Sequence, residues 1–276
     1  MSAPAAPATP PFVPVVQVDG RPAEAADLAP LAFAGHAHFT AMQVRGGGIR
    51  GLDLHLARLR NGSEEMYGRA LPDERIVGYL RTALAGAPQD VSLTAVVYEP
   101  SGEFVADDGA GLRVLVRIGP PSDGPEGPLA LSLVAYERVL PHIKHVGEVA
   151  KTHYKRRAVA EGFDDAAFLD SSGNLSEASI WNLVFWDGTA VVWPKAPILQ
   201  GTTLQILRRR LAALGVPQRD AVLSPADLPG LAGAAVVNSW TPGIAVHRIG
   251  GTAIPAAPAF MRTLHDAFRS EPAEAP

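Results

Sequence analysis

The chain has 276 residues, a formal net charge of -4 and no cysteine. This length exceeds the roughly 100–150 residues of a typical domain and favours two domains, while the lack of cysteine excludes disulfides, thiolate metal sites and a cysteine nucleophile. The charge balance argues against a nucleic-acid partner, and without a secretion signal or an apolar run of roughly 20 residues we expect a cytoplasmic protein that does not enter a membrane.

The first half of the chain alternates between predicted strands and helices. Residues 1–14 are rich in alanine and proline, and we expect them to form a disordered tail. A strand is predicted through Met42–Val44, and two more in VSLTAVVYEP and LRVLVRIG. Helical periodicity begins near Leu52, and a second helix is expected to end at Gly86. Residues 15–118 are therefore predicted to form an α+β domain.

A segment with three glycines and four prolines, residues 119–128, interrupts this pattern. It cannot continue a helix or an inner strand, so we predict a linker. The C-terminal domain, residues 129–276, is predicted to begin with a strand, followed by a lysine-bearing loop and a helix over roughly 151–161. Further on, NLVFW and TAVVW flank Asp187-Gly188, which predicts a hairpin with a type I′ turn.

The lysine-bearing loop contains the first candidate for chemistry. Lysine occurs only at Lys144, Lys151, Lys155 and Lys195, whereas 20 of the 24 basic residues are arginine. The neighbours of Lys144 in VLPHIKHVGEVA are mostly apolar, and a desolvated ammonium has a lowered pKa and can form an imine. The alternative is a solvated lysine on a surface loop.

A carboxylate and an anion site are the next candidates. Glu177 in NLSEASIWNL either caps a helix or turn, or faces the pyridine nitrogen of a cofactor. The helix predicted to begin at GTTLQ and to end at Gly215 can use Thr202 or Thr203 as its N-cap, and its free N–H groups can bind an anion. Arg58 in HLARL could grip phosphate oxygens, or it is a solvated arginine.

The order of these motifs, with NSWTPGIAVHRIGG as a fifth, resembles the fold-type IV, or class IV, pyridoxal-phosphate-dependent aminotransferases. That family includes branched-chain and D-amino-acid aminotransferases, (R)-selective amine transaminases and aminodeoxychorismate lyase. The resemblance extends over about 16–268. It implies an α/β fold, with an α+β N-terminal domain and a β-rich α/β C-terminal domain like those of D-amino-acid aminotransferase. It also implies a homodimer in which the second subunit completes an active site between the domains.

The resemblance assigns roles to individual residues and requires no metal. It implies that Lys144 carries pyridoxal 5'-phosphate, that Glu177 faces the ring nitrogen, and that the phosphate is bound by Arg58, Thr202, Thr203 and Ser239. Lys151 is a rival for the cofactor lysine. The family glycine, Gly162, lies 18 residues after Lys144 and 11 after Lys151, which favours Lys144. Lys151 and Lys155 are then interpreted as charges on one helix face.

Several positions depart from the family pattern. Gly147 and Val149 occupy places where the family has asparagine and tyrosine, Phe39 replaces a tyrosine and Thr40 a glutamate, and LTAVVYEP lacks the usual arginine. A clamp for the substrate carboxylate is therefore not evident. The substrate-pocket candidates are Phe39, His36 and Tyr98, with His38, His142 and His145 as further polar contacts.

These observations predict a transaminase that moves an amino group between an amino acid or amine and a keto acid. Two alternatives stay open. One is a lyase that splits 4-amino-4-deoxychorismate on the same cofactor, and the other is a binding protein that keeps the fold without turnover.

Overall fold

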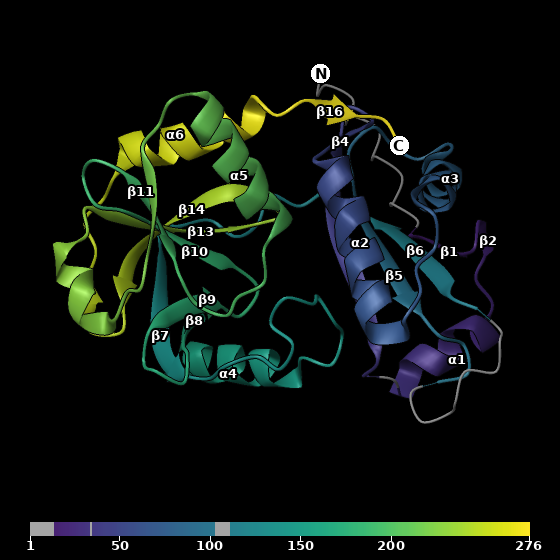
Figure 1. The fold of residues 1–276 in the computed structure, drawn as a ribbon, viewed down its shortest axis with the longest axis horizontal. Coiled ribbons are helices and arrows are strands. Elements are labelled where there is room, and N and C mark those ends of the chain that lie inside the picture. The colour runs from purple at the N-terminus through teal and green to yellow at the C-terminus, as the bar shows by residue number, and fades with distance from the viewer. Residues whose placement is uncertain (1–13, 34, 103–110) are drawn as a thin grey trace, which may run out of the picture.

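A computed structural model describes residues 14–33, 35–102 and 111–276. The predicted disordered tail therefore lies outside the described residues, apart from the exposed Pro14. Two sheets organise the chain and stand side by side (Figure 1). Among the described residues, no helix is long and apolar enough to span a bilayer.

The first sheet is antiparallel and has seven strands in the order β16-β4-β3-β5-β6-β1-β2. Its unit contains β1 (Val15–Val18), β2 (Arg21–Pro22), α1 (Ala25–Phe33), β3 (Ala37–Arg45), β4 (Gly48–Arg50), α2 (Leu52–Tyr67), α3 (Asp73–Leu84), β5 (Val91–Tyr98) and β6 (Arg113–Gly119). Alternate residues of β3 and β5 are buried, as expected for strands with one face against a core. Leu59 of α2 and Leu80 of α3 pack against that face, and α2 lies between it and the second unit (Figure 1).

The second sheet has the order β12-β11-β10-β13-β14-β7-β8-β9, with β15 paired to β14. Its unit contains β7 (Leu129–Ala135), α4 (Val149–Ala160), β8 (Asp165–Leu169), β9 (Leu175–Ala178), β10 (Asn182–Trp186), β11 (Val191–Pro194), α5 (Thr202–Ala213), β12 (Gln218–Ala221), the 3-10 helix η1 (Pro225–Gly230), β13 (Gly233–Asn238), β14 (Thr241–Ile249), β15 (Thr252–Ala253) and α6 (Pro258–Arg269). Because β9 pairs with both β8 and β10, six strands close into a ring.

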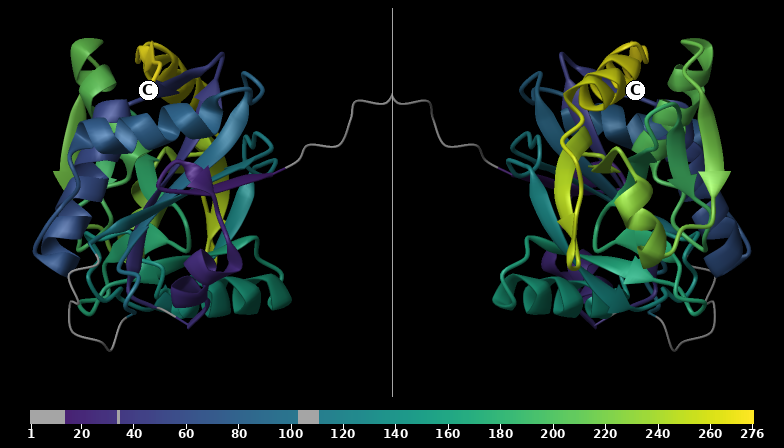
Figure 2. Two further views of the ribbon diagram at one scale, coloured as in Figure 1. Left: turned by 90° about the vertical axis from the view of Figure 1, so that its right-hand side faces the viewer. Right: turned by 90° about the vertical axis from the view of Figure 1, so that its left-hand side faces the viewer.

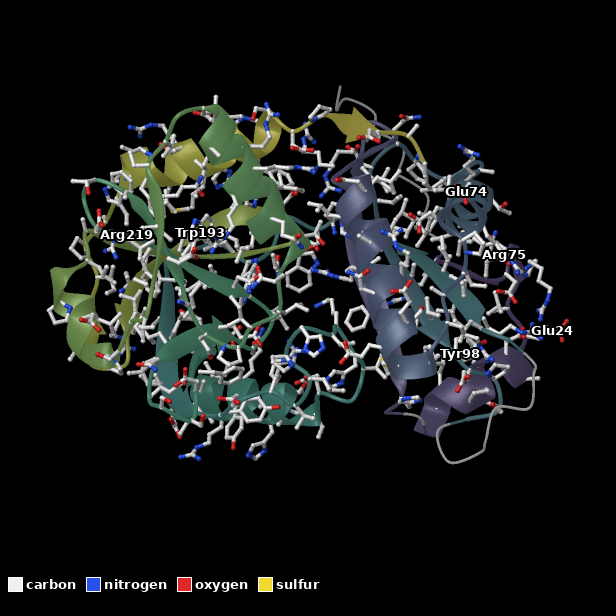
Figure 3. All side chains as sticks on the ribbon, in the orientation of Figure 1. Glu24, Glu74, Arg75, Tyr98, Trp193 and Arg219 are labelled. Atoms are coloured by element: carbon white, nitrogen blue, oxygen red, sulfur yellow. The ribbon has the colours of Figure 1, made fainter. Side chains whose placement is uncertain are left out.

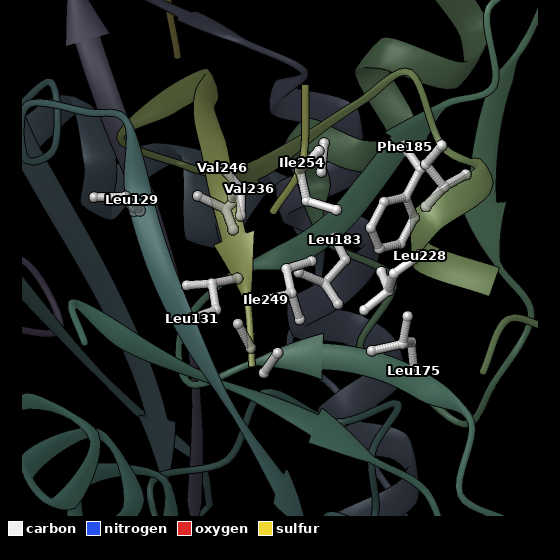
Figure 4. Packing of buried hydrophobic residues seen from close by; sticks show 14 of the residues in the cluster. Leu129, Leu131, Leu175, Leu183, Phe185, Leu228, Val236, Val246, Ile249 and Ile254 are labelled. Atoms are coloured by element: carbon white, nitrogen blue, oxygen red, sulfur yellow. The ribbon is translucent and has the colours of Figure 1, made fainter. Parts of the chain in front are cut away.

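The ring encloses the largest apolar cluster of the second unit. Figure 4 shows Leu131, Leu183, Phe185 and Ile249 meeting in its interior, and all four are fully buried or nearly so. Helices α5 and α6 cover one end of the unit and α4 lies at the other, as the side views also show (Figure 2). The ring is therefore a packed core, and the space for a ligand lies outside it.

The last residues of the chain return to the first sheet. Strand β16 (Ala273–Glu274) pairs with β4, although the sequence assigned these residues to the C-terminal domain. Beside this crossing, Arg209 of α5 forms ion pairs with Glu271 and, at 2.8 Å, with Asp53 of α2. The chain thus passes between the sheets twice, once through residues 120–128 and once after α6.

Several predicted boundaries differ from the structure. Strand β3 is three times longer than predicted because it pairs with β5 along its whole first part, from Ala37 to Val44. The hairpin of β10 and β11 is confirmed, but a type I′ turn is wrong. Asp187 N–H bonds to Ala190 O, so Gly188 and Thr189 are the central residues, and only Gly188 has a positive φ.

Candidate active site

A cavity of about 200 Å³, here called the inner cavity, opens where the two units meet. Its wall contains five of the six predicted cofactor residues, which come from α2, the β7–α4 loop, β9, α5 and the segment after β13: Arg58, Lys144, Glu177, Thr202 and Ser239.

The outermost members of this set, Arg58 and Ser239, are 181 residues apart in the sequence. The packing of the two units is what brings them together.

Lys144 lies in the loop between β7 and α4, and main-chain hydrogen bonds fix this loop to β3. Phe39 N–H donates to Lys144 O at 2.8 Å, and the Lys144 Nζ lies 4.8 Å from the centroid of the Phe39 ring. Burial lowers the pKa of Lys144 to about 7, and the charges of Arg58 and Lys151 act in the same direction. At neutral pH, a large share of this amine is therefore unprotonated.

Glu177 lies inside β9 and is buried. Its Oε1 accepts a hydrogen bond from Arg138 at 3.3 Å, and its Oε2 accepts the Leu199 N–H at 3.3 Å. Burial raises the pKa of Glu177, and the charge of Arg138 opposes that effect. Glu177 does not cap a helix, because it belongs to a strand, and its carboxylate forms part of the cavity wall.

Arg138 is a site residue that the sequence did not reveal. It is buried in the cavity wall, donates to Pro141 O and Ile143 O at 2.8 Å each, and pairs with Glu148 at 2.7 Å. It therefore fixes the loop that carries Lys144 and also contacts Glu177. A single arginine in an irregular loop belongs to no periodic pattern, so only its nearness to Lys144 in the sequence could have suggested it.

The opposite side of the cavity has the donors of an anion site. Thr202 is the first residue of α5, and its hydroxyl is buried without a hydrogen-bond partner among the described residues. The N-cap is Gly201, so the prediction that a threonine caps this helix is wrong. A Cβ at Gly201 would lie 2.1 Å from Asn182 Oδ1, which leaves room only for glycine. Free N–H groups and the helix dipole favour an anion here.

Arg58 and the other two predicted phosphate ligands lie near this helix start. Arg58 Nη2 donates to Gln200 O at 2.9 Å, and burial lowers the pKa of Arg58 to about 10. Ser239 lines the inner cavity, whereas Thr203 does not. The Thr203 hydroxyl donates to Asn238 O at 2.7 Å and faces a neighbouring cavity. A cationic guanidinium, an unpaired hydroxyl and a helix N-terminus together fit a phosphate group.

Of the substrate-pocket candidates, only Phe39 lines the inner cavity. Tyr98 is 2% exposed and donates its hydroxyl to Asp27 O at 2.9 Å, beneath α1 and on the side of the first unit away from the cavity (Figure 3). Its assignment to the pocket is wrong, because its side chain packs in a separate apolar cluster. His36 packs edge-on against Tyr67, and its place in the substrate pocket stays a prediction.

The other histidines have partners of their own. His38 is buried with its Nε2 2.9 Å from Ser63 Oγ, and burial lowers its pKa to about 4. His142 lies 2.8 Å from Glu65 at the surface. His145 lies 2.9 Å from Glu148 and lines a second, larger space of about 570 Å³, here called the outer cavity.

The outer cavity adjoins the inner one. Both are lined by Phe39, Lys151, Ser179 and Ile180. Lys151 was interpreted as a charge on one face of a helix, and in the structure it is partly buried at this junction. Lys155, one turn further along α4, lies 3.6 Å from Asp165. The described ranges contain no group of three or more His, Asp or Glu side chains that could hold a metal ion.

A lysine of low pKa, a buried carboxylate and a phosphate-type anion site around one cavity are the groups that pyridoxal phosphate requires. The sequence model of the class IV amino-transferase family matches residues 37–249, and the chain belongs to this family. It is accordingly a pyridoxal-phosphate-dependent enzyme of fold type IV.

Solved structures share the fold at low sequence identity. A branched-chain aminotransferase from Thermoproteus uzoniensis is 18% identical, with a TM-score of 0.78 and coverage of 92% of this chain and 93% of its own. A hypothetical aminotransferase from Mycobacterium tuberculosis in its PLP-bound form is 23% identical, with a TM-score of 0.75 and coverage of 93% and 98%. A candidate 4-amino-4-deoxychorismate lyase from Legionella pneumophila is 17% identical, with a TM-score of 0.76 and coverage of 90% and 95%. The curated proteins include no match to this sequence.

Proposed function

We propose that this enzyme transfers an amino group between an amino acid or amine and a keto acid, with Lys144 as the lysine that binds the cofactor. The observation that carries the proposal is the position of Lys144 in one cavity wall with Glu177, Arg58 and Thr202. When bound, pyridoxal phosphate supplies an electron sink for the negative charge that develops on the substrate carbon.

The chain's own residues divide the work of holding the cofactor. Arg58, the Thr202 hydroxyl and the first N–H groups of α5 would bind the phosphate, and Ser239 would add a further hydroxyl. Glu177 would keep a proton on the ring nitrogen, and Arg138 favours the charged form of this carboxylate. Loss of a phosphate ligand should therefore weaken cofactor binding more than it slows the chemical step.

Lys144 is the group that moves the proton. A general base works best when its pKa lies close to the working pH, and the pKa of Lys144 is lowered to about 7. With the cofactor bound, the free amine of Lys144 would be placed to accept a proton from the substrate carbon, and its ammonium form would hold that proton for return. The Phe39 ring, close to Nζ, restricts the positions that this amine can reach.

Reduction with borohydride followed by peptide mapping tests the assignment. We expect a pyridoxyl group on Lys144 and none on Lys144→Ala, while Lys195→Ala, which changes an exposed lysine, should be labelled like the wild type. An enzyme without any lysine adduct would contradict the covalent role. An adduct on Lys151 would mean that Lys151, and not Lys144, binds the cofactor.

The size of the outer cavity also fits a lyase that splits 4-amino-4-deoxychorismate into 4-aminobenzoate and pyruvate, because this substrate is larger than a simple amino acid. Release of pyruvate from that substrate without a keto acid would favour the lyase. A requirement for the keto acid as acceptor supports transamination. An enzyme that binds the cofactor but exchanges amino groups with no donor would be a binding protein.

We also propose that the enzyme is a homodimer. Four apolar side chains in and after the Lys144 loop are exposed: Val139 (75%), Leu140 (42%), Val146 (38%) and Val149 (82%). Clustered apolar surface of this kind marks an interaction site, and a second copy would cover it beside the outer cavity. Sedimentation equilibrium should give twice the chain mass, and Val149→Glu should shift the equilibrium toward the monomer. A monomeric wild-type enzyme would contradict the proposal.

A further inference from the structure

The junction between the two cavities has features that the cofactor does not use. Phe39, Lys151, Ser179 and Ile180 line both spaces, so a molecule that reacts beside Lys144 and extends outward must pass these four side chains. The junction is therefore the place at which the enzyme can select its substrate.

Lys151 is a cation without an assigned partner at this junction. Among the described residues it has no hydrogen bond or ion pair, although it is partly buried. The carboxylates whose charges act on Lys151 are those of Glu148 and Glu177, and both are paired with Arg138, at 2.7 and 3.3 Å. Burial lowers the pKa of Lys151. A partly buried ammonium whose neighbouring carboxylates are shared with another cation favours the binding of a further anion.

Ser179 gives a second, independent observation. Its side chain is 1% exposed, and its hydroxyl has no hydrogen-bond partner within the described part of the chain. Buried hydroxyls are nearly always hydrogen-bonded, so this one is available to a ligand. An ammonium and a hydroxyl donor in the same wall can bind the two oxygens of a carboxylate.

We propose that Lys151 and Ser179 bind the carboxylate of the substrate, so that the enzyme selects α-amino and α-keto acids over amines that lack this group. The inference rests on the proposed function and names a specificity site within it. Arg156, exposed at the wall of the outer cavity and without a partner among the described residues, adds positive charge that attracts such anions. Phe39 and Ile180 offer apolar contacts to the carbon skeleton.

The test compares two unreactive probes on the cofactor-loaded enzyme by calorimetry, 3-phenylpropanoate and its neutral amide. We expect the wild type to bind the carboxylate more tightly and Lys151→Met to lose about 10- to 100-fold of that preference, as for a lost charge-assisted hydrogen bond. Lys151→Arg should keep most of the preference and Ser179→Ala should lose a smaller part. Lys195→Met is the matched control, because it removes an exposed lysine outside both cavities.

Two results would overturn the inference: equal binding of the two probes by the wild type, or an unchanged preference in Lys151→Met. Mapping of the borohydride adduct separates this failure from that of the proposed function. An adduct on Lys144 with no effect of Lys151→Met rejects only the carboxylate site. An adduct on Lys151 rejects both.

Discussion

Replacement of Arg138 by methionine should weaken the whole enzyme, because this side chain has four partners in the structure. Arg138 is 5% exposed and bonds to Glu148, Glu177 and two main-chain carbonyls. Arg138→Met keeps much of the volume and removes every one of these contacts. Two largely buried carboxylates are then left without their cation.

The size of the loss of stability follows from the burial of these charged groups. Removing one partner of a buried ion pair destabilises a protein by about 3–5 kcal/mol, since the remaining charge is not compensated. A loss of that size corresponds to a fall in Tm of roughly 5–9 °C for a chain of this length. Arg157→Met is the matched control, because the Arg157–Glu161 pair is exposed and its removal should leave Tm unchanged.

The loss of stability in Arg138→Met should also depend on pH. Burial by itself would raise the pKa of Glu148, but hydrogen bonds from His145 and the charge of Arg138 lower it to about 2, below the ordinary 4.5. A carboxyl with a lowered pKa stabilises the fold above its unfolded pKa, and this contribution is lost as the pH falls toward 2. The difference between Arg138→Met and wild type should therefore be greatest above pH 5 and shrink in acid.

Thermal unfolding at a fixed excess of pyridoxal phosphate, from pH 4 to pH 8, measures both effects. The predicted loss of stability is refuted if the variant melts within 2 °C of the wild type at pH 7, a difference of about 1 kcal/mol for this size of protein. It is also refuted if the difference between the two proteins grows as the pH falls.

Three further predictions concern the cofactor site. Thr202→Val should weaken pyridoxal phosphate binding about tenfold, the effect of one lost hydrogen bond to a charged group. It should not lower the Tm of the cofactor-free protein, because the hydroxyl has no partner among the described residues; fluorescence titration measures the binding and thermal unfolding the Tm. The rate at which pyridoxal phosphate attaches to the cofactor-free enzyme should rise with pH and level off just above pH 7, because the amine of Lys144 loses its proton there. A rate that continues to rise up to pH 10 would contradict the lowered pKa of Lys144. Gly201→Ala should destabilise the enzyme by about 1–3 kcal/mol, because the new Cβ meets Asn182 Oδ1. Gly78→Ala is the control, since a Cβ there enters open space and should not destabilise the enzyme. Denaturant unfolding measures the stability of both variants.

Local sequence patterns predicted the helices and strands better than they predicted the tertiary contacts of those elements. The helix that begins at Leu52 and the hairpin of β10 and β11 follow directly from hydrophobic period and turn residues. The first residues of β3 were missed because AHFTA mixes histidine and threonine with apolar residues, and pairing with β5 determines the strand there. Tyr98 lies in a predicted strand, but the sequence could not show that its side chain lies beneath α1.

The same limit applies to the candidate site. Thr202 and Thr203 are adjacent, so their side chains point about 100° apart on the helix, and only the packing of α5 shows that the first faces the inner cavity. Helical spacing placed Lys151 and Lys155 on one side of α4 without showing what that side meets. Arg138 could not be found, because its role depends on contacts with residues as distant as Glu177.

The return of β16 to the first sheet restricts how the two units can move. Two polypeptide tethers join them, one at residues 120–128 and one after α6, and Arg209 links α5 to α2 beside the second. A hinge motion can turn only about an axis that passes near both tethers. Wide separation of the units would require β16 to detach, so substrate and product should exchange through the outer cavity while the two halves remain together.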